Sequence, residues 1–298
     1  NPSVGLSFSP TQTLNTYASY SESNRAPTSM ELGCANENAP CKLPNSMAGD
    51  PPLKQVVAKT WEAGLRGKLT NDFAWNLGVF STVNHDDIQF IAANTSEGYF
   101  SNVGKTRRRG VETGLAGKLG AFTLGGNYTY LDATYESDLE VNGVFNSSND
   151  DGKIDVKKGS RIPLIPHHML KLYADYQVTD KFVVGLNSNT ISDSFARGNE
   201  NGDHESQNAN NSGKIAGYTV FNLSGSYQIQ PKWTVFGRVL NLFDREYETA
   251  ALLGQNPFNA ATGTYQLYSG NRKTTSVAET YVAPGAPRTG WIGVRYSF

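Results

Sequence analysis

Apolar and polar residues alternate with a period of two in segment after segment of this chain. In residues 61–69, WEAGLRGKL, apolar residues or glycine occupy every odd position, and the charged residues lie at even positions. Residues 111–119 largely follow the same rule, and residues 168–178 follow it with the apolar residues at even positions. A period of two is typical of β-strands with one apolar and one polar face. The sequence therefore predicts a protein built mainly from such strands.

The pattern marks a series of strand-like runs joined by alternately short and long connections. The runs are residues 2–8, 11–24, 54–69, 72–90, 98–119, 121–137, 161–178, 181–197, 217–229, 232–249 and 286–298. The short joints, rich in turn-forming residues, are 9–12, 69–72, 119–122, 178–181 and 230–233. The long, polar joints are about 25–53, 91–97, 138–160, 198–216 and 250–285. This order predicts an antiparallel sheet whose strands are joined by short turns at one end and by large loops at the other.

The length of the runs separates two all-β folds. Strands of a β-sandwich average about five or six residues, and their outer face meets water. Several runs here are much longer, and their apolar alternation lies next to the short turns, where Trp75, Phe122 and Tyr227 also gather. Strands that cross a thin apolar layer and continue beyond it, with an aromatic girdle, are typical of membrane barrels. The predicted fold class is therefore all-β, an antiparallel transmembrane β-barrel.

Composition agrees with this prediction and disfavours other classes. Hydrophobic residues make up only 38% of the 298 residues, which is low for a large soluble core, whereas 15 Tyr, 14 Phe and 30 Gly supply rings and turns. The net charge of -1 argues against a protein that binds nucleic acid. No stretch approaches the roughly 20 apolar residues that a membrane helix needs.

The two cysteines lie close together in a polar joint. Cys34 and Cys41 belong to the segment GCANENAPCKLPN, which is rich in turn formers. Two cysteines so close together favour a disulfide and therefore an oxidising compartment. A pair of free thiols is the alternative, and a metal site is disfavoured because no histidine lies nearby to complete four ligands.

Five segments, in order along the chain, resemble motifs of the TonB-dependent outer-membrane receptors of Gram-negative bacteria. They are YASYSESNRAPT at 17–28, TWEAGLRGKL at 60–69, NVGKTRRRGVETGL at 102–115, VLNLFDREYET at 239–249 and the terminal RYSF at 295–298. Each motif is weak by itself, but five in the right order over the whole chain make a strong resemblance.

The resemblance implies a barrel of 22 strands around a plugged lumen, with a plug domain and a TonB box ahead of the barrel. Neither is recognisable here, and the pattern supplies about ten complete strands plus a truncated first strand at Val4–Phe8. We therefore expect residues 1–298 to be the C-terminal part of the receptor barrel, here a partial barrel, with the plug domain and TonB box absent. The alternative is a small barrel that stands alone, which requires residues 2–8 not to form a strand.

The resemblance also implies a function. We expect an outer-membrane receptor that binds a scarce solute, such as a ferric siderophore or another metal chelate, and imports it actively with energy supplied through TonB. Its location would be the outer membrane of a Gram-negative bacterium. Its partners would be outer-membrane lipid and lipopolysaccharide, the TonB energy-transducing complex and the barrel assembly machinery. A passive porin or a surface adhesin-like barrel is the alternative, followed by an enzyme at the barrel rim.

The residues themselves disfavour an enzyme, because none of the common nucleophile, zinc or phosphate motifs is present. The nearest candidate for a rim enzyme is His85-Asp86-Asp87, for which a solvated strand is the favoured interpretation. The segment NDDGKID at 149–155 is similar to a calcium loop, but Lys158 stands where a bidentate glutamate is required. We expect no catalytic residue, no metal site and no cofactor.

Aromatic and cationic residues of the long joints and upper strands are the candidates for binding a solute, because they combine contact area with charge. These candidates are Tyr99, Phe100, His204, Tyr265, Tyr268, Arg272 and Lys273. For each of them alone, packing within a loop is the favoured interpretation, but we expect two or more of the set to contact the solute.

Arg107-Arg108-Arg109 is the one dense basic run. The parity of residues 111–119 puts Arg107 and Arg109 on the lipid-facing side, just above the apolar band, and Arg108 on the inward side. We expect the outer pair to contact lipid phosphates through charge-assisted hydrogen bonds. Solvation or ion pairing with neighbouring strands is the alternative.

The last run alternates up to the final residue of the chain. Ile292, Val294, Tyr296 and Phe298 share one parity, which we expect to face lipid, and Arg295 has the other, which faces the lumen. Such an ending also resembles the signal read by the machinery that assembles outer-membrane barrels.

Overall fold

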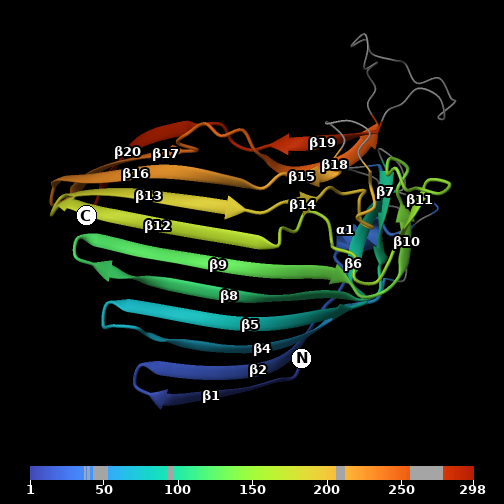
Figure 1. Ribbon diagram of the computed structural model, residues 1–298, viewed down its shortest axis with the longest axis horizontal. Coiled ribbons are helices and arrows are strands. Elements are labelled where there is room, and N and C mark those ends of the chain that lie inside the picture. Colours follow the sequence, from blue (N-terminus) through green and yellow to red (C-terminus); the bar gives the residue numbers. More distant parts are fainter. Residues whose placement is uncertain (37, 39–40, 43–52, 93–96, 206–211, 256–277) are drawn as a thin grey trace, which may run out of the picture.

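The main structural element is a long, curved antiparallel sheet, seen in a computed structural model of the chain (Figure 1). The structure describes residues 1–36, 38, 41–42, 53–92, 97–205, 212–255 and 278–298. Neighbouring strands of the sheet are consecutive along the chain, apart from short strands in the long joints. The two edges of the sheet are formed by the first and the last strand, so the described residues form a partial barrel.

The sheet has 11 strands in the order β1-β2-β4-β5-β8-β9-β12-β13-β16-β17-β20. Their bounds are β1 Ser3–Thr11, β2 Leu14–Arg25, β4 Val56–Lys68, β5 Phe73–His85, β8 Thr106–Leu119, β9 Phe122–Tyr135, β12 His168–Thr179, β13 Phe182–Ile191, β16 Tyr218–Gln230, β17 Trp233–Leu240 and β20 Thr289–Tyr296. The all-β antiparallel fold predicted from the alternation is thereby confirmed, and each predicted run contains one strand of the main sheet.

The short turns all lie at one end of the sheet (Figure 1). Tight turns separate the strands within the pairs β1–β2, β4–β5, β8–β9, β12–β13 and β16–β17. In the turn between β8 and β9, Gly120 adopts a φ of 58°, a left-handed conformation that glycine reaches without steric cost. These connections confirm the prediction that one end of the sheet carries only short turns.

Several predicted runs are longer than the strands that form within them. The run 72–90 breaks after β5 because Asp86 adopts a φ of 52°, and the run 98–119 breaks at Gly104, with a φ of 79°. The run 161–178 yields a strand only from His168, since prolines at 163 and 166 have no amide hydrogen to donate. The run 232–249 breaks at Asn241, which has a φ of 49°. A period of two therefore does not reveal turns that lie inside an alternating polar stretch.

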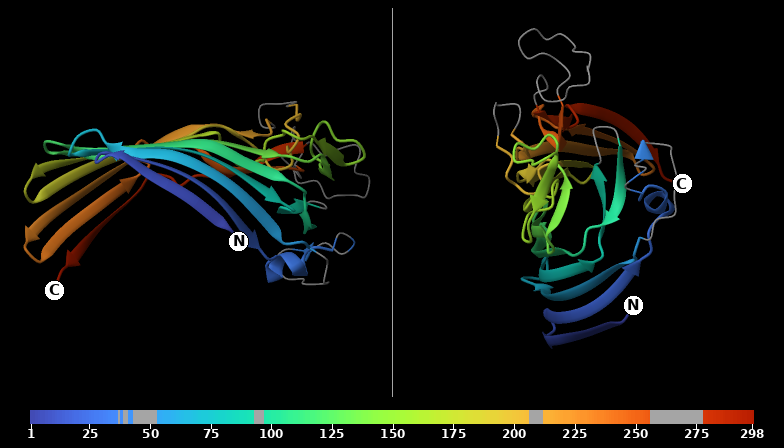
Figure 2. Two further views of the ribbon diagram at one scale, coloured as in Figure 1. Left: turned by 90° about the horizontal axis from the view of Figure 1, so that it is seen from below. Right: turned by 90° about the vertical axis from the view of Figure 1, so that its right-hand side faces the viewer.

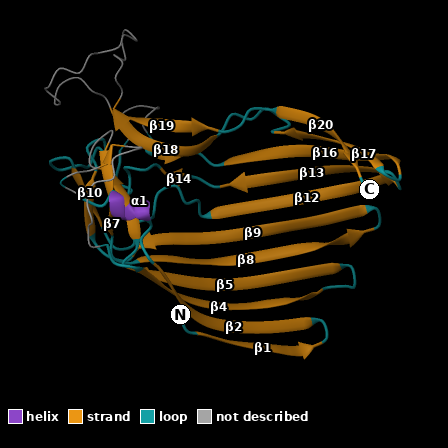
Figure 3. Ribbon diagram, turned by 180° about the vertical axis from the view of Figure 1, so that it is seen from behind, coloured by secondary structure: helices purple, strands orange, loops and turns teal. Residues whose placement is uncertain are grey.

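A second layer of short elements, which we call the loop tier, lies at the end opposite the short turns (Figures 1 and 3). It contains β3 Cys41–Lys42, β6 Ile88–Ala92, β7 Glu97–Asn102, β10 Leu139–Asn142, β11 Lys153–Val156, β14 Ser194–Phe195, β15 Lys214–Ile215, β18 Glu248–Gln255 and β19 Ala278–Pro284. These strands form the small sheets β3-β7-β6, β10-β11, β14-β15 and β18-β19. The long joints thus contain folded structures of their own.

The loop tier also contains the short helix α1, Ser29–Gly33. Its N-cap, Thr28, forms a capping box with Glu31: the Glu31 amide donates to the threonine hydroxyl at 3.2 Å, and the Thr28 amide donates to the Glu31 carboxylate at 2.7 Å. Arg25 adds a bidentate ion pair to the same carboxylate. In the described part of the chain, no helix is long and apolar enough to cross a membrane.

Strand pairing divides the side chains of the sheet into two faces that continue from strand to strand. The face on which Trp61, Val79, Leu115 and Ile292 lie is here called the outer face, and the opposite one the inner face. These four outer side chains are 43–78% exposed. Contiguous apolar surface on this scale is typical of a contact with lipid or another protein, because leaving it in water costs about 25 cal/mol per Å².

The curvature of the sheet (Figure 2) and the polar character of its inner face suit a barrel wall. The ring of Tyr17 lies across Gly64, where a β-carbon would come within 2.6 Å of the ring, so only glycine fits there. The Tyr17 hydroxyl donates to Oε1 of Glu62 at 2.8 Å. A polar side chain thus lies flat over a glycine of the adjacent strand on this face.

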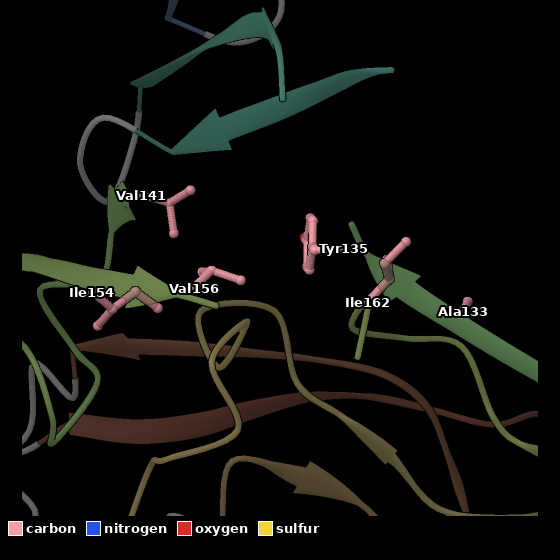
Figure 4. Close-up of a cluster of buried hydrophobic side chains, with 6 residues drawn as sticks. All are labelled: Ala133, Tyr135, Val141, Ile154, Val156 and Ile162. Atoms are coloured by element: carbon pink, nitrogen blue, oxygen red, sulfur yellow. The ribbon is translucent and has the colours of Figure 1, made fainter. Parts of the chain in front are cut away.

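The largest buried apolar cluster joins the sheet to the loop tier (Figure 4). It consists of Ala133, Tyr135, Val141, Ile154, Val156 and Ile162. Ala133 and Tyr135 come from the end of β9, whereas the β10–β11 hairpin supplies Val141, Ile154 and Val156. The core of the described residues therefore lies above the sheet and holds the loops in place, rather than inside a sandwich.

Ile154→Ala is expected to loosen the β10–β11 hairpin. Ile154 is 2% exposed, and removing a buried isoleucine side chain typically costs about 2–5 kcal/mol. Hydrogen exchange should become faster at residues 139–156, whereas β4 and β5 should keep their protection. The matched control Val144→Ala, at a side chain that is 39% exposed, should leave exchange unchanged, and an equal effect of both changes would contradict the assigned core.

Candidate functional site

The predicted solute-binding residues Tyr99 and Phe100 lie on β7 of the loop tier. The Phe100 ring packs edge-to-face against Phe90 of β6, with ring centroids 5.2 Å apart. Its amide donates to the carbonyl oxygen of Cys34 at 2.7 Å. Tyr99 pairs with Ile91, and alternation along the strand puts it on the opposite face of β7. Phe100 therefore has a packing role in this hairpin.

His204 also has a packing role. It is 9% exposed, its Nδ1 accepts a hydrogen bond from the Ser147 amide at 3.0 Å, and its own amide donates to Oδ1 of Asn199 at 3.1 Å. The first of these bonds joins the loop after β14 to the loop between β10 and β11, and the second lies within the loop after β14. Of the candidates in the described residues, His204 lies in this pair of loops and the β7 aromatics lie in another hairpin. The remaining candidates, Tyr265, Tyr268, Arg272 and Lys273, lie outside the described residues.

Buried asparagines hold the same two loops together. Asn146 is 1% exposed and Asn199 is fully buried. The side-chain amide of Asn146 donates to the Gly198 carbonyl at 2.9 Å and to Oδ1 of Asn201 at 3.1 Å. The side-chain amide of Asn199 donates to the Gly213 carbonyl at 3.1 Å. The asparagine-rich composition of both joints is the signal that the sequence offers. It indicates only loop chemistry, because pairing between distant loops cannot be read from spacing.

Two ionisable groups are buried outside these hydrogen bonds: Glu200, in the loop after β14, and Tyr135, at the end of β9. One oxygen of Glu200, Oε1, accepts from the Gly198 amide at 2.9 Å, while Oε2 is enclosed with no partner among the described residues. Burial raises the pKa of the Glu200 carboxyl. Burial likewise raises the pKa of Tyr135, whose hydroxyl donates to Gln89 at 3.1 Å. Both groups therefore favour their neutral forms in the folded loop tier.

The residues considered for metal or rim chemistry have structural partners instead. In the part of the chain that the structure describes, no group of three or more His, Cys, Asp or Glu side chains could hold a metal ion. Residues 149–153 form a turn in which the Lys153 amide donates to the Asp150 carbonyl. Asp87 accepts from the Thr106 hydroxyl at 2.6 Å and lies 3.6 Å from the Arg108 guanidinium.

The basic run on β8 has the predicted parity. Arg107 pairs across the sheet with Thr134 and Arg109 with Asp132, on the outer face. The guanidinium of Arg107 lies 2.9 Å from the Glu136 carboxylate, and that of Arg109 lies 2.9 Å from the Asp132 carboxylate. Ion pairing with a neighbouring strand is therefore present at both positions. Their predicted contact with lipid phosphate stays a prediction.

The inner face near the C-terminal edge combines arginines with aromatic rings. The Arg295 guanidinium lies 5.4 Å from the Phe236 ring centroid, and the Arg238 guanidinium lies 5.9 Å from the Trp291 ring. Each pair bridges β17 and β20, whose register places these side chains on the same face. Arg295 thus lies opposite in parity to Ile292, as expected from the alternation.

A concave site of about 640 Å³ is lined by the start of β16, the segment after β17, and residues of β18 and β19. The rings of Tyr218 and Tyr247 pack 4.4 Å apart in its wall. Charged residues of the segment after β17, including Asp244, Arg245 and Glu246, also line it. Aromatic area and several charges in one hollow suit a polar solute that carries rings. The sequence identifies residues 239–249 only as a family motif and does not show that they line a concave site.

His204→Ala is expected to loosen the loop after β14 and the loop between β10 and β11. Solute contacts that do not depend on these two loops should stay unchanged. The change removes the acceptor of the Ser147 amide, and a hydrogen bond of this kind typically contributes about 0.5–1.5 kcal/mol. Hydrogen exchange at residues 146–149 and 199–205 should become faster. The control Lys157→Ala alters an exposed side chain outside these two loops and should leave their exchange unchanged. Unchanged exchange together with lost solute binding would instead make His204 a direct ligand contact.

Comparisons with known proteins agree with this geometry. The sequence profile of the family described as TonB dependent receptor-like, beta-barrel matches residues 1–242. The ferric-pyoverdine M114 receptor PbuA of Pseudomonas sp. (strain M114) is 25% identical over 206 residues, which cover 65% of this chain and 22% of that protein. The catecholate siderophore receptor Fiu of Escherichia coli (strain K12) is 24% identical over 248 residues, covering 83% of this chain and 29% of that protein.

Among solved structures, the siderophore receptor PiuA from Acinetobacter baumannii matches with a TM-score of 0.64 at 18% identity, covering 99% of this chain and 35% of that chain. At this identity the likeness shows the fold alone. The chain spans about a quarter of the length of the curated relatives it matches. Because the profile match covers most of the sequence, the chain belongs to the TonB-dependent receptor β-barrel family, whose members are outer-membrane transport receptors of Gram-negative bacteria rather than enzymes.

Proposed function

We propose that the protein carrying this chain binds a ferric siderophore or a related metal chelate outside the cell and imports it actively. The observation that carries the proposal is the family match over residues 1–242, together with relatives named as ferric-pyoverdine and catecholate siderophore receptors. The metal in such a chelate is cargo, so a metal site built from protein side chains is not required.

The chemistry of the inner face supports a bulky ligand of this kind. Two arginines contact aromatic rings across β17 and β20, and Tyr218 and Tyr247 line a separate concave site. Cations and rings together suit a chelate that carries negative oxygen ligands and planar groups. Tyr99, which shares β7 with the packed Phe100, and the candidates in residues 256–277 are proposed to add contacts from the loops.

Energy is proposed to reach this receptor through TonB. Residues 1–298 are proposed to be the C-terminal part of the barrel, with the plug domain and the TonB box outside this chain. The coverage of only 22% and 29% of the curated relatives supports this assignment. A barrel of 22 strands would also give edge partners to β1 and β20, which are the two edges of the described sheet.

Cys34 and Cys41 are proposed to form a disulfide that fixes the loop next to β7. Cys41 pairs with Gly98 of β7, and the Cys34 carbonyl accepts from the amide of Phe100 on the same strand. Cys34 is 8% exposed, so its sulfur is shielded from bulk solvent. The outer surface of the cell is oxidising enough to keep such a bond.

The C-terminal strand is proposed to carry the signal for the barrel assembly machinery. Ile292, Val294 and Tyr296 lie on the outer face of β20, and Phe298 follows with the same parity. The Tyr296 ring contacts Trp233 at 4.8 Å and Phe298 at 5.1 Å. This aromatic group at the short-turn end supports the proposal.

Deleting the gene for the complete receptor is expected to abolish uptake of one iron-loaded siderophore by iron-starved cells. Uptake of ⁵⁵Fe bound to purified siderophores of the catecholate and pyoverdine type measures this directly. Complementation should restore uptake only while TonB and the proton gradient are intact, because active import needs energy. A passive porin would instead keep importing after the gradient is collapsed, and an adhesin-like barrel would leave uptake unchanged.

A further inference from the structure

Two positively charged side chains contact the same aromatic ring in the loop tier. The guanidinium carbon of Arg161 lies 5.1 Å from the centroid of Phe195, and the ammonium nitrogen of Lys214 lies 5.3 Å from it. Both distances fall within the range of cation–π contacts, about 6 Å. Two like charges held at one ring repel each other, so the arrangement favours an anion that contacts both. We call Arg161, Phe195 and Lys214 the Phe195 cluster.

The charge of the Phe195 cluster is not neutralised by a carboxylate of the described residues. Within these residues neither Arg161 nor Lys214 forms an ion pair, whereas Arg107 and Arg109 each have a carboxylate within 2.9 Å. Those carboxylates belong to Glu136 and Asp132, which lie two residues to either side of Thr134. Thr134 in turn forms a β-bridge with Arg161. The positive charge of the cluster is therefore available to a ligand.

A neighbouring histidine responds to the same field. Burial, and next the charge of Arg161, lower the pKa of His167, while the nearby Asp132 and Asp193 raise it and His168 lowers it. The net direction is downward although Asp132 lies 3.7 Å away. The charge of Arg161 thus adds to burial in disfavouring the protonated form of His167.

Backbone pairing places the cluster on the outer face. Arg161 forms an antiparallel bridge with Thr134, which in turn pairs with Arg107 of β8. Residues paired in this way point to the same side of a sheet. The Phe195 cluster therefore lies on the perimeter of the barrel wall and not in its lumen, apart from the proposed solute site.

The height of the cluster along β9 identifies the layer that it meets. Tyr128, Tyr130 and His168 form an aromatic group on the outer face, with ring centroids 5.3–6.1 Å apart for the pairs with His168. Such groups mark the boundary between hydrocarbon and headgroups. Thr134 lies four residues beyond Tyr130, which is about 13 Å along the strand at about 3.3 Å per residue. With a strand tilt of about 40° this is about 10 Å along the membrane normal. Phospholipid headgroups extend only about 5–8 Å from the hydrocarbon. The cluster therefore lies farther out from the hydrocarbon than these headgroups reach.

We propose that the Phe195 cluster binds a phosphate group on the sugar headgroup of an outer-leaflet glycolipid. Arg161 and Lys214 donate charge-assisted hydrogen bonds to the phosphate oxygens, and the Phe195 ring contacts both cations. A sugar headgroup reaches the height of the cluster, whereas the phosphate of a glycerophospholipid does not. The inference rests on the outer-membrane location of the family and does not depend on which solute the receptor imports.

The test compares the complete receptor with its Arg161→Ala, Lys214→Ala double variant, purified in detergent. Native mass spectrometry and titration with purified lipopolysaccharide measure the bound glycolipid. The double variant is expected to bind at least about tenfold more weakly, because one charge-assisted hydrogen bond can contribute a factor of this size. Phe195→Leu, which keeps an apolar side chain but removes the ring face, should give a smaller loss.

Controls separate the cluster from general charge and from other anions. Lys157→Ala removes an exposed lysine of the loop tier that pairs with Asp155 and should leave binding unchanged. Lipopolysaccharide stripped of its phosphates should bind the original receptor as weakly as intact lipopolysaccharide binds the double variant. Equal affinity of the original and the double variant for the intact glycolipid would overturn the proposal. Equally effective competition by inorganic phosphate at the same concentration would overturn it as well, since the site would then bind free phosphate.

Discussion

The hydrogen bonds between neighbouring antiparallel strands are the interaction on which the rest of this structure depends. A backbone that crosses hydrocarbon has no water to satisfy its amides and carbonyls, so each strand must be paired along its length. In this chain the pairing runs from β1 to β20 through consecutive long strands. It fixes which side chains meet lipid and which face inward. The position of Trp61 on one face and Glu62 on the other follows from this register alone.

Pairing also explains why the core of the protein lies where it does. A single curved sheet has no second sheet to pack against, and its outer apolar residues are covered by lipid instead. The buried cluster around Ile154 and Val156 forms only above the sheet, where strand ends and long joints fold over one another. Buried asparagines and His204 then join separate loops through hydrogen bonds. The loops thereby present a defined outer surface on a rigid wall.

The sequence was sufficient for the sheet because a period of two reports directly on which side a residue faces. The parity of Arg107, Arg109 and Arg295 could be predicted in the same way. The breaks at Asp86 and Asn241 were missed, since a left-handed residue does not interrupt alternation. The roles of His204 and Asn146 were missed for another reason: they depend on contacts between joints more than 50 residues apart. The pairing of Arg161 with Phe195 and Lys214 is equally non-local.

Each long strand has one face toward lipid and one toward the lumen, and every other feature of the wall follows from this division. Single spin labels at Thr113, Leu115, Ala116 and Lys118 of β8, in the complete receptor reconstituted in a bilayer, measure it most directly. Accessibility to oxygen, which concentrates in hydrocarbon, should be high at Thr113 and Leu115 and low at Ala116 and Lys118. Uniform accessibility along β8, or the opposite alternation, would contradict the assigned faces.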